Sequence, residues 1–173
     1  MRTQGAEVDF NLRFENGLSL YLNGAYTDAT YVSFANAPPP VELSGGTIQF
    51  VDISDEPLPG VSKWSASFGS EYVFPATLLG NAGELFVAAD GFFRSEWSSN
   101  PSPSDYMWVD DYTLLNVRAG FRTDATWNVV VWARNVTDED YFDLLSAQPG
   151  STGMIAGQPA EQRTYGVTYS VEF

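Results

Sequence analysis

Apolar and polar residues alternate one by one along much of this chain. In the first such stretch, residues 7–15, one side carries Val8, Phe10, Leu12 and Phe14. Because successive side chains of a β-strand point to opposite faces, a period of two residues predicts a strand and not a helix. Asn16-Gly17 follows, and this dipeptide favours a tight hairpin turn because both residues tolerate a positive φ. The alternation resumes over residues 18–26, so the first two strands are predicted to form a hairpin.

The same alternation predicts five further strands, near residues 62–74, 84–97, 111–122, 126–136 and 164–173. Phe86 and Phe92 interrupt the alternation in the second of these, so its register is the least regular. Residues 138–147 leave room for one helical turn at most, and no other segment has a helical period. We therefore predict an all-β chain of about seven antiparallel strands.

The predicted connections alternate between short and long. The short ones are residues 16–17, 75–83 and 124–125, and the long ones are residues 35–60, 98–110 and 137–160. Outer-membrane barrels show this alternation, with short periplasmic turns and long extracellular loops. Most of the predicted strands also reach the roughly 9–11 residues that a tilted strand needs to cross a membrane. The pattern therefore favours an up-and-down transmembrane β-barrel segment over a soluble sheet.

Aromatic residues collect at both ends of the apolar sides of these strands. Near the short turns they are Phe14, Phe74, Phe121, Trp127 and Phe173, and near the long loops they are Tyr26, Trp64, Trp97 and Tyr165. Amphipathic rings favour the boundary between membrane and water, so two such belts are typical of a membrane barrel. The alternative is that these rings form the core of a soluble sandwich.

Composition removes most catalytic possibilities. The chain has 173 residues, no cysteine and no histidine, which excludes disulfides, zinc–thiolate sites and Ser-His-Asp triads. We predict no enzymatic activity, no cofactor and no metal site. The net charge of −14 disfavours nucleic-acid binding, which depends on Lys and Arg. No apolar run is long enough for a membrane helix, and residues 1–7 lack the apolar core of a signal peptide.

The C-terminal third carries a specific resemblance. Residues 132–142, with Asn135, Asp138 and Tyr141, resemble the signature near the end of TonB-dependent outer-membrane receptors. Residues 162–173 resemble the last strand of that family. Residues 58–64 and 112–120 resemble two of its earlier strands, although Ser62 and Val136 replace commoner Pro and Leu. The resemblance covers almost the whole chain.

This resemblance implies a plugged barrel of 22 strands, of which residues 1–173 form the C-terminal part. It implies active import of a scarce ligand, with a ferric siderophore preferred over cobalamin or a glycan. Energy would come from the TonB complex, which acts on a TonB box near the receptor's N-terminus. The plug and that box have no counterpart in the chain, and seven strands cannot close the barrel. We therefore expect either that the gene model is truncated, with Met1 an internal methionine, or that the chain is a natural fragment. Its expected location is the bacterial outer membrane, in contact with lipid.

The resemblance also implies a partner in biogenesis. In this class of protein, a terminal aromatic residue preceded by alternating apolar residues is read by the barrel-assembly machinery. The matching residues here are Tyr165, Val167, Tyr169, Val171 and Phe173. An ordinary amphipathic strand that ends in Phe is the alternative.

Ligand contacts are expected from the long loops, because aromatic rings there can stack on a ligand. The candidates are Tyr106, Trp108, Tyr141 and Phe142, although each ring could instead anchor its own loop. The polar sides of the strands supply a predicted lumen wall of Glu7, Asp9, Arg13, Lys63, Glu71, Asp90, Arg94, Glu96, Arg118, Arg122 and Arg134. The acidic group Asp138, Glu139, Asp140 and Asp143 matches no calcium-loop spacing.

Two other functions compete with import. One is a barrel without TonB, such as a porin or the translocator of an autotransporter. The other is a soluble β-sandwich that binds a partner. The long loops and the residues 135–141 favour the receptor, and the sequence does not identify its ligand.

Overall fold

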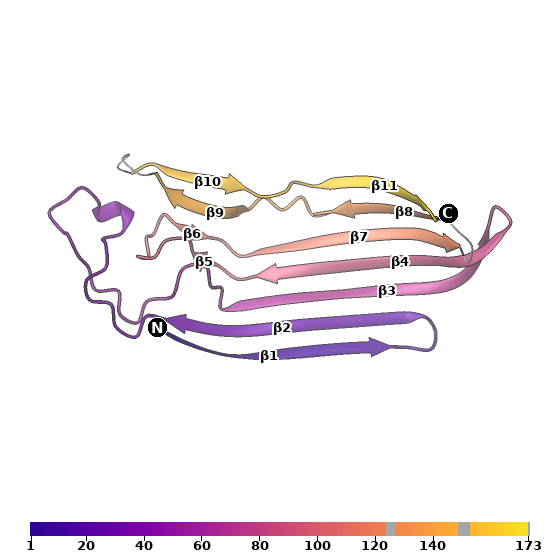
Figure 1. The fold of residues 1–173 in the computed structure, drawn as a ribbon, viewed down its shortest axis with the longest axis horizontal. Helices are drawn as coiled ribbons and strands as arrows, with labels where there is room; N and C mark the ends of the chain where they lie inside the picture. The colour runs from indigo at the N-terminus through magenta and orange to yellow at the C-terminus, as the bar shows by residue number, and fades with distance from the viewer. Residues whose placement is uncertain (124–126, 149–152, 173) are drawn as a thin grey trace.

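Seven long strands form one antiparallel sheet in the computed structural model, which describes residues 1–123, 127–148 and 153–172 (Figure 1). Along the sheet they are β1 (Arg2–Arg13), β2 (Leu18–Thr30), β3 (Trp64–Leu78), β4 (Asn81–Arg94), β7 (Tyr112–Thr123), β8 (Trp127–Arg134) and β11 (Thr164–Val171). Each strand pairs with the long strand that precedes it in the chain. The prediction of seven up-and-down strands is confirmed.

The long connections contain short elements of their own. They are η1 (Val41–Leu43), a single 3-10 turn, and the strands β5 (Trp97–Ser98), β6 (Trp108–Val109), β9 (Phe142–Ala147) and β10 (Ile155–Pro159). Residues 138–147, which left room for one helical turn at most, instead form a strand in their second half, which pairs with β10. A partner strand far along the chain decides this segment, and the local sequence does not reveal it.

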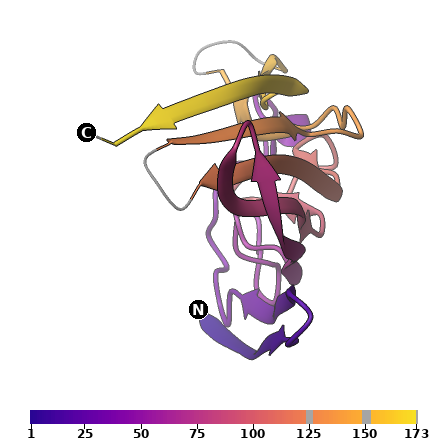
Figure 2. The ribbon, with the colours of Figure 1, turned by 90° about the vertical axis from the view of Figure 1, so that its right-hand side faces the viewer.

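The sheet is curved and is not closed, as the end-on view shows (Figure 2). The connections predicted to be long lie together at one end (Figure 1). The predicted connection 75–83 is shorter than expected, because β3 continues to Leu78 and β4 begins at Asn81. Leu79 and Gly80 form the turn with positive φ values of 53° and 80°. The predicted turn at residues 124–125 lies outside the described residues.

Four of the strand pairs place an aromatic ring directly opposite a glycine. The pairs in register are Tyr21 with Gly69, Phe68 with Gly91, Phe86 with Gly120, and Trp132 with Gly166. A Cβ atom added to Gly91 would lie 2.5 Å from the ring of Phe68. The ring therefore covers the backbone of the neighbouring strand, an arrangement that fixes the register of a sheet.

The two faces of the sheet differ in chemistry. One face, the apolar face, exposes Val87, Val117, Val131 and Val167, each at least 42% exposed. The opposite, polar face carries Glu71, Asp90 and Arg118. Phe86, which interrupts the alternation of β4, lies on the polar face and is buried, with the guanidinium of Arg122 3.9 Å from its ring centre. The positive charge over the ring covers an apolar group on an otherwise polar surface.

The predicted aromatic belts are present in part. Near the loops, Tyr26 and Trp64 touch on the apolar face, with ring centres 4.7 Å apart. Near the short turns, the ring centres of Phe121 and Trp127 are 5.6 Å apart, and Trp127 lies 6.2 Å from Tyr169. Trp97 was expected in the belt near the loops, and this is wrong.

Trp97 is 5% exposed and lies within the loops, because β4 ends at Arg94 and the chain turns inward into β5. Phe173 lies outside the described residues. Among the residues that the structure describes, no helix is long and apolar enough to cross a membrane.

Candidate functional site

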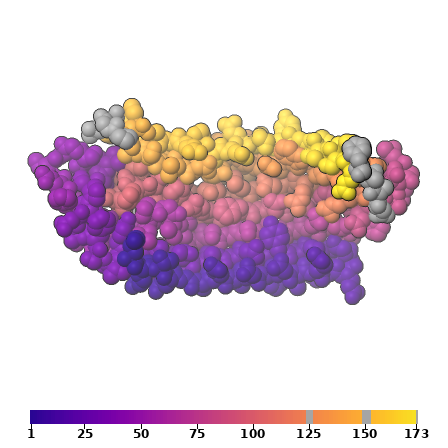
Figure 3. Space-filling view, viewed as in Figure 1, coloured from indigo at the N-terminus to yellow at the C-terminus, as the bar shows by residue number. Residues whose placement is uncertain are grey.

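Three connections pack together beyond one end of the sheet, and we call them the loop cap: residues 31–63, 95–111 and the described part of 135–163. The space-filling view shows them as one continuous mass next to the strands (Figure 3). The cap has its own buried apolar side chains, which are Ala37, Ile53, Trp97, Met107 and Val109. A buried core in loops this polar requires that their backbone and side-chain polar groups find internal partners.

The serine-rich segment 98–104 supplies many of these partners. Ser98, Ser102 and Ser104 are each no more than 3% exposed. The hydroxyl of Ser104 donates to Glu42 Oε2 at 2.6 Å, and the backbone N–H of Asp105 donates to Glu42 Oε1 at 3.1 Å. Glu42 thereby joins the first loop to the second.

The neighbouring serines extend this connection to all three loops. The hydroxyl of Ser102 donates to the carbonyl of Pro38 in the first loop. The hydroxyl of Ser99 donates to the carbonyl of Leu145 at 2.7 Å and accepts from the N–H of Leu145 at 3.0 Å. The sequence predicted only a long loop at residues 98–110 and did not identify the internal role of these serines.

Two carboxylates of the first loop are stabilised in their charged forms. Burial alone would raise the pKa of Glu42, but hydrogen bonds from Ser104 and from the N–H groups of Glu42 and Asp105 outweigh it and lower that pKa. The hydroxyl and N–H of Ser54 both donate to Asp52 and lower the pKa of its carboxyl group. Charge-assisted bonds of this kind are stronger than bonds between neutral groups.

Asn135, the first residue of the family signature, forms the turn at the end of β8. Its φ is +49°, a left-handed conformation that Asn tolerates better than most residues. Its side-chain amide donates to the carbonyls of Glu139 at 2.9 Å and Glu161 at 3.3 Å, and its Oδ1 accepts from the N–H of Glu139 at 2.9 Å. Its own N–H donates to Asn116 Oδ1 at 3.1 Å.

Asp138 and Tyr141, the other two signature residues, also join separate segments. Asp138 pairs with Arg163 at 2.9 Å, next to the start of β11. The Tyr141 ring stacks on Tyr112 of β7, with ring centres 4.1 Å apart. Burial and then the negative charge of Asp143 raise the pKa of the Tyr141 hydroxyl. The signature therefore holds β7, β8 and β11 together where the sheet meets the loop cap.

The four candidate ligand-contact residues do not form one site. Tyr106 is 66% exposed on the surface of the cap. Phe142 is half exposed, and its ring lies against Gly157 of β10. Tyr141 is occupied by its stack on Tyr112, whereas Trp108 lines a cavity between the cap and the strand ends.

Part of the predicted lumen wall forms a charged network on the polar face. Arg118 lies 2.8 Å from Asp90 and 3.7 Å from Glu71, and Arg122 lies 3.2 Å from Glu71. The Asn116 amide donates to Asp90 at 2.8 Å. In these half-exposed pairs, carboxylates and guanidinium groups of neighbouring strands neutralise one another. This part of the wall is therefore polar and mixed in charge, as predicted.

Two other arginines of the predicted wall have different surroundings. Arg94 donates to Ser62 Oγ and to the Gly60 carbonyl, both at 2.7 Å, and so holds the loop cap. The guanidinium of Arg134 lies over the Trp132 ring, 5.2 Å from its centre. Among the described residues, no group of three or more Asp or Glu side chains is arranged to hold a metal ion.

Four of the five residues of the expected assembly signal lie on β11, the last strand of the sheet, and the fifth, Phe173, lies outside the described residues. Tyr165, Val167 and Tyr169 are between 65% and 81% exposed on the apolar face, and Val171 is 39% exposed. Within the part of the chain that the structure describes, β11 pairs with β8 along one edge and has no strand on the other. The alternating apolar side that the sequence predicted is therefore present over these four residues.

Comparison with known proteins agrees with this architecture. Residues 1–136 match the family model described as "TonB dependent receptor-like, beta-barrel". The fold is similar to the ferric yersiniabactin uptake receptor FyuA from Yersinia pestis, with a TM-score of 0.72 and 16% identity over 99% of this chain and 23% of that one. It is also similar to the siderophore receptor PiuA from Acinetobacter baumannii, with a TM-score of 0.70 and 17% identity over 96% of this chain and 21% of that one.

The chain thus spans less than a quarter of the length of either receptor. At these identities the structural likeness establishes the fold alone. No curated protein matches the chain. The family model covers more than three quarters of it, with 136 of 173 residues matched, and the chain therefore belongs to the family of TonB-dependent receptor-like β-barrels.

Proposed function

We infer that this chain forms part of the wall and outer loops of a bacterial outer-membrane receptor that imports a scarce ligand. Family membership supports the receptor, and the names of the two similar structures favour a ferric siderophore as the ligand. The chain acts by binding and passage, not by catalysis, and needs no cofactor. Outer-membrane lipid contacts the apolar face, and the TonB complex acts through a region of the receptor beyond residues 1–173.

The observation that carries the proposal is the contrast between the two faces of one sheet. The apolar face exposes valines in the middle of four strands, which is unfavourable in water and favourable against lipid. The polar face pairs carboxylates with arginines, as the wall of a water-filled or plugged lumen does. The loop cap at one end supplies a folded outer surface.

The family resemblance adds one partner to this function. The barrel-assembly machinery reads the last strand, with Tyr165, Val167, Tyr169, Val171 and Phe173 as the recognised residues. Ligand contacts come from the loops, for which Tyr106, Trp108, Tyr141 and Phe142 remain the candidates. The signature residues Asn135, Asp138 and Tyr141 position those loops.

The test is uptake of iron by the source bacterium. The coding region of the chain is deleted, and ⁵⁵Fe uptake is measured with siderophores recovered from the strain's own iron-limited medium. We expect uptake to fall in the deletion strain and to stop in the parent when a protonophore removes the energy that TonB uses. Unchanged ⁵⁵Fe uptake after deletion would contradict siderophore import. A porin would instead be indicated if the deletion reduced the passage of small solutes across the outer membrane and the protonophore had no effect on that passage.

A further inference from the structure

The chain contains two Asn-Gly pairs, and the fold places them in different surroundings. Asn16-Gly17 lies in the turn between β1 and β2, at the end of the sheet opposite the loop cap (Figure 1). Asn23-Gly24 lies within β2. An asparagine before glycine is chemically labile, because glycine has no side chain to hinder attack of its backbone nitrogen on the asparagine amide. The tertiary structure therefore decides which of the two pairs reacts.

The first pair lies in an exposed turn that is held by few bonds. Asn16 is exposed, and its Oδ1 accepts from the N–H of Leu18 at 3.2 Å. The N–H of Gly17 donates to the carbonyl of Phe14, also at 3.2 Å. Both distances are at the long end of the range for such bonds. The tip of this turn can therefore rearrange at the cost of two weak bonds, which water replaces.

The second pair is held by strands on both sides. Gly24 lies opposite Val8 of β1 and opposite Ala66 of β3, and Asn23 is half-buried. The reaction of an Asn-Gly pair closes a ring, which requires the asparagine to rotate about its Cα–C bond. Rotation at Asn23 would break the hydrogen-bond ladders on both sides of β2, whereas rotation at Asn16 disturbs only the turn.

The turn cannot avoid the labile pair by changing its glycine. Gly17 has a φ of +92°, a conformation that residues with a side chain rarely adopt. A Cβ atom added there would collide with the carbonyl oxygen of Val73 in β3. The N–H of Val73 donates to the carbonyl of Gly17 at 3.0 Å. The contact between this turn and β3 therefore requires glycine directly after Asn16.

We propose that Asn16 is a site of spontaneous deamidation in the folded chain and that Asn23 is protected. The nitrogen of Gly17 attacks Cγ of Asn16, the Cγ–Nδ2 bond breaks, and ammonia leaves with the proton of the Gly17 nitrogen. Water then opens the cyclic imide. Attack at Cγ leaves aspartate at position 16, and attack at the backbone carbonyl leaves isoaspartate. This modification is independent of the import proposal and needs no ligand.

The two products have different effects on the turn. Aspartate keeps the main chain unchanged and keeps an oxygen that can accept from the N–H of Leu18. Isoaspartate inserts one carbon atom into the main chain before Gly17. That insertion displaces Gly17 from Val73 and breaks the bond between them. Isoaspartate should therefore weaken the attachment of the β1–β2 hairpin to β3.

The test uses the complete chain refolded in detergent micelles, with folding checked by circular dichroism. Incubation at mildly alkaline pH in H₂¹⁸O labels every imide that hydrolyses during the experiment. Peptide mass spectrometry then compares Asn16 with Asn23 in the same molecules, and an isoaspartyl methyltransferase assay measures isoaspartate. We expect Asn16 to react at least tenfold faster than Asn23 in the folded chain, because the turn opens locally at lower cost than the ladder. In urea the two rates should become similar.

Two variants separate the chemistry from its effect on stability. Asn16→Gln should stop the reaction at position 16, because its longer side chain would have to close a larger ring, and it should leave the rate at Asn23 unchanged. The incubated natural chain should unfold at lower urea concentration than before incubation, whereas incubated Asn16→Gln should not. Freshly made Asn16→Asp should keep its unfolding midpoint, since it adds the charge without changing the main chain.

Three results would each overturn the proposal. The first is an equal or faster rate at Asn23 than at Asn16 in the folded chain. The second is no label at position 16 in the folded chain under conditions that label it in urea, because the turn would then protect Asn16. The third is an equal loss of stability in the incubated natural chain and in incubated Asn16→Gln, which would assign the loss to another residue.

Discussion

The seven-stranded sheet, which we call the strand wall, and the loop cap differ in which side chains they bury and which they expose. In the wall, Val87, Val131 and Val167 stay exposed while polar side chains pair across the other face. In the cap, Ser98, Ser102 and Ser104 are buried, and Trp97 and Met107 form a core. This inversion supports the proposal that the wall faces lipid and the cap faces water.

The largest expected effect is a charge placed on the lipid side of the wall. Val131→Arg should destabilise the folded chain in phospholipid bilayers by about 2–4 kcal/mol, because a cation near the midplane loses its hydration. Val130→Arg is the matched control, since the adjacent side chain points to the polar face. Urea unfolding in bilayers measures both variants. Equal losses at the two positions would contradict the assignment of the faces.

A smaller loss is expected where the wall joins the cap, at Asn135. Asn135→Ala removes the buried side chain that accepts from the N–H of Glu139 and strains a left-handed backbone. We expect a loss of roughly 1–3 kcal/mol. Asn135→Gly keeps the backbone conformation without the side chain, so the difference between the two variants isolates the strain. The same urea titration measures the loss of stability in both variants. An unchanged unfolding midpoint in both would show that the turn needs neither the Asn135 side chain nor a residue that tolerates a positive φ.

A pH-dependent effect is expected within the cap. The folded pKa of Glu42 is lowered, so its bonds stabilise the cap above the unfolded pKa, and this stability is lost as the pH falls through the folded pKa. Pulsed EPR distances between spin labels at Ile48 and Tyr106, both exposed, should broaden on acidification. In Glu42→Gln the distances should respond less to pH, because only the lowered pKa of Asp52 remains. An undiminished response in this variant would assign the pH dependence to another group.

The smallest effect is expected on the polar face. Arg118→Met breaks the pairs with Asp90 and Glu71, yet both carboxylates remain partly exposed to water. Half-exposed ion pairs contribute about 0–1 kcal/mol, so unfolding should shift within that range. A loss of stability as large as that caused by Val131→Arg would mean that water does not reach the carboxylates of the polar face.

Some elements of the fold could be predicted from the sequence, and others could not. The strands and their pairing order were predictable, because alternation and turn residues are local signals. The inward position of Phe86 was not, since it depends on Gly120 across the strand pair and on the Arg122 side chain above it. The β9–β10 hairpin and the burial of Trp97 were missed for a similar reason. Both depend on contacts between segments that are far apart in the sequence.

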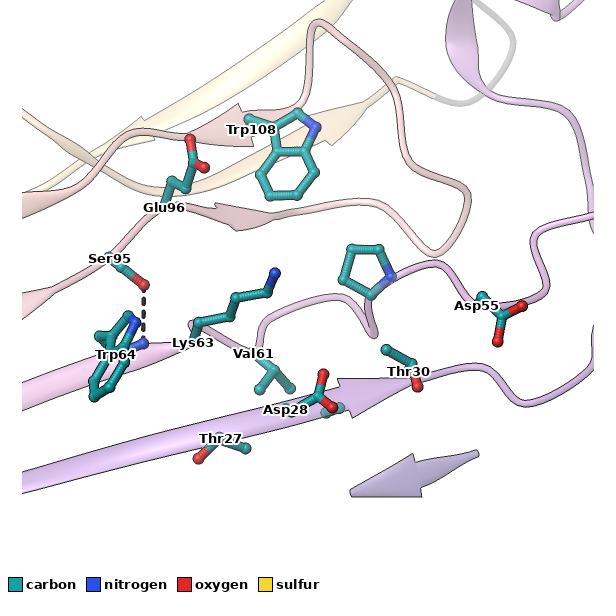
Figure 4. Close-up of a pocket in the computed structure, with 12 residues that line it drawn as sticks. Thr27, Asp28, Thr30, Asp55, Val61, Lys63, Trp64, Ser95, Glu96 and Trp108 are labelled. Carbon is teal, nitrogen blue, oxygen red and sulfur yellow. Dashed lines mark hydrogen bonds between the residues drawn. The ribbon is translucent and has the colours of Figure 1, made fainter. Parts of the chain in front are cut away.

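The candidate functional site was likewise predictable only in part. The sequence identified Asn135, Asp138 and Tyr141 through a family signature and gave no physical role for them. The structure supplies that role as a junction of β7, β8 and β11. The aromatic candidates were chosen by residue type alone, and the structure places Trp108 at a cavity between the loop cap and the strand ends (Figure 4). Residue type suggests a ligand contact, but the position of the side chain decides whether it is available.

By itself, the sequence determined the class of the protein: an antiparallel sheet with one lipid-compatible face, short turns at one end and long loops at the other. Periodicity, turn residues and composition are properties of a few neighbouring residues, so they can be recognised in the sequence alone. Only the tertiary structure decided how the loops are held together by Ser99, Ser102 and Ser104. Those features arise from hydrogen bonds between segments up to 64 residues apart, whose partners no local pattern specifies.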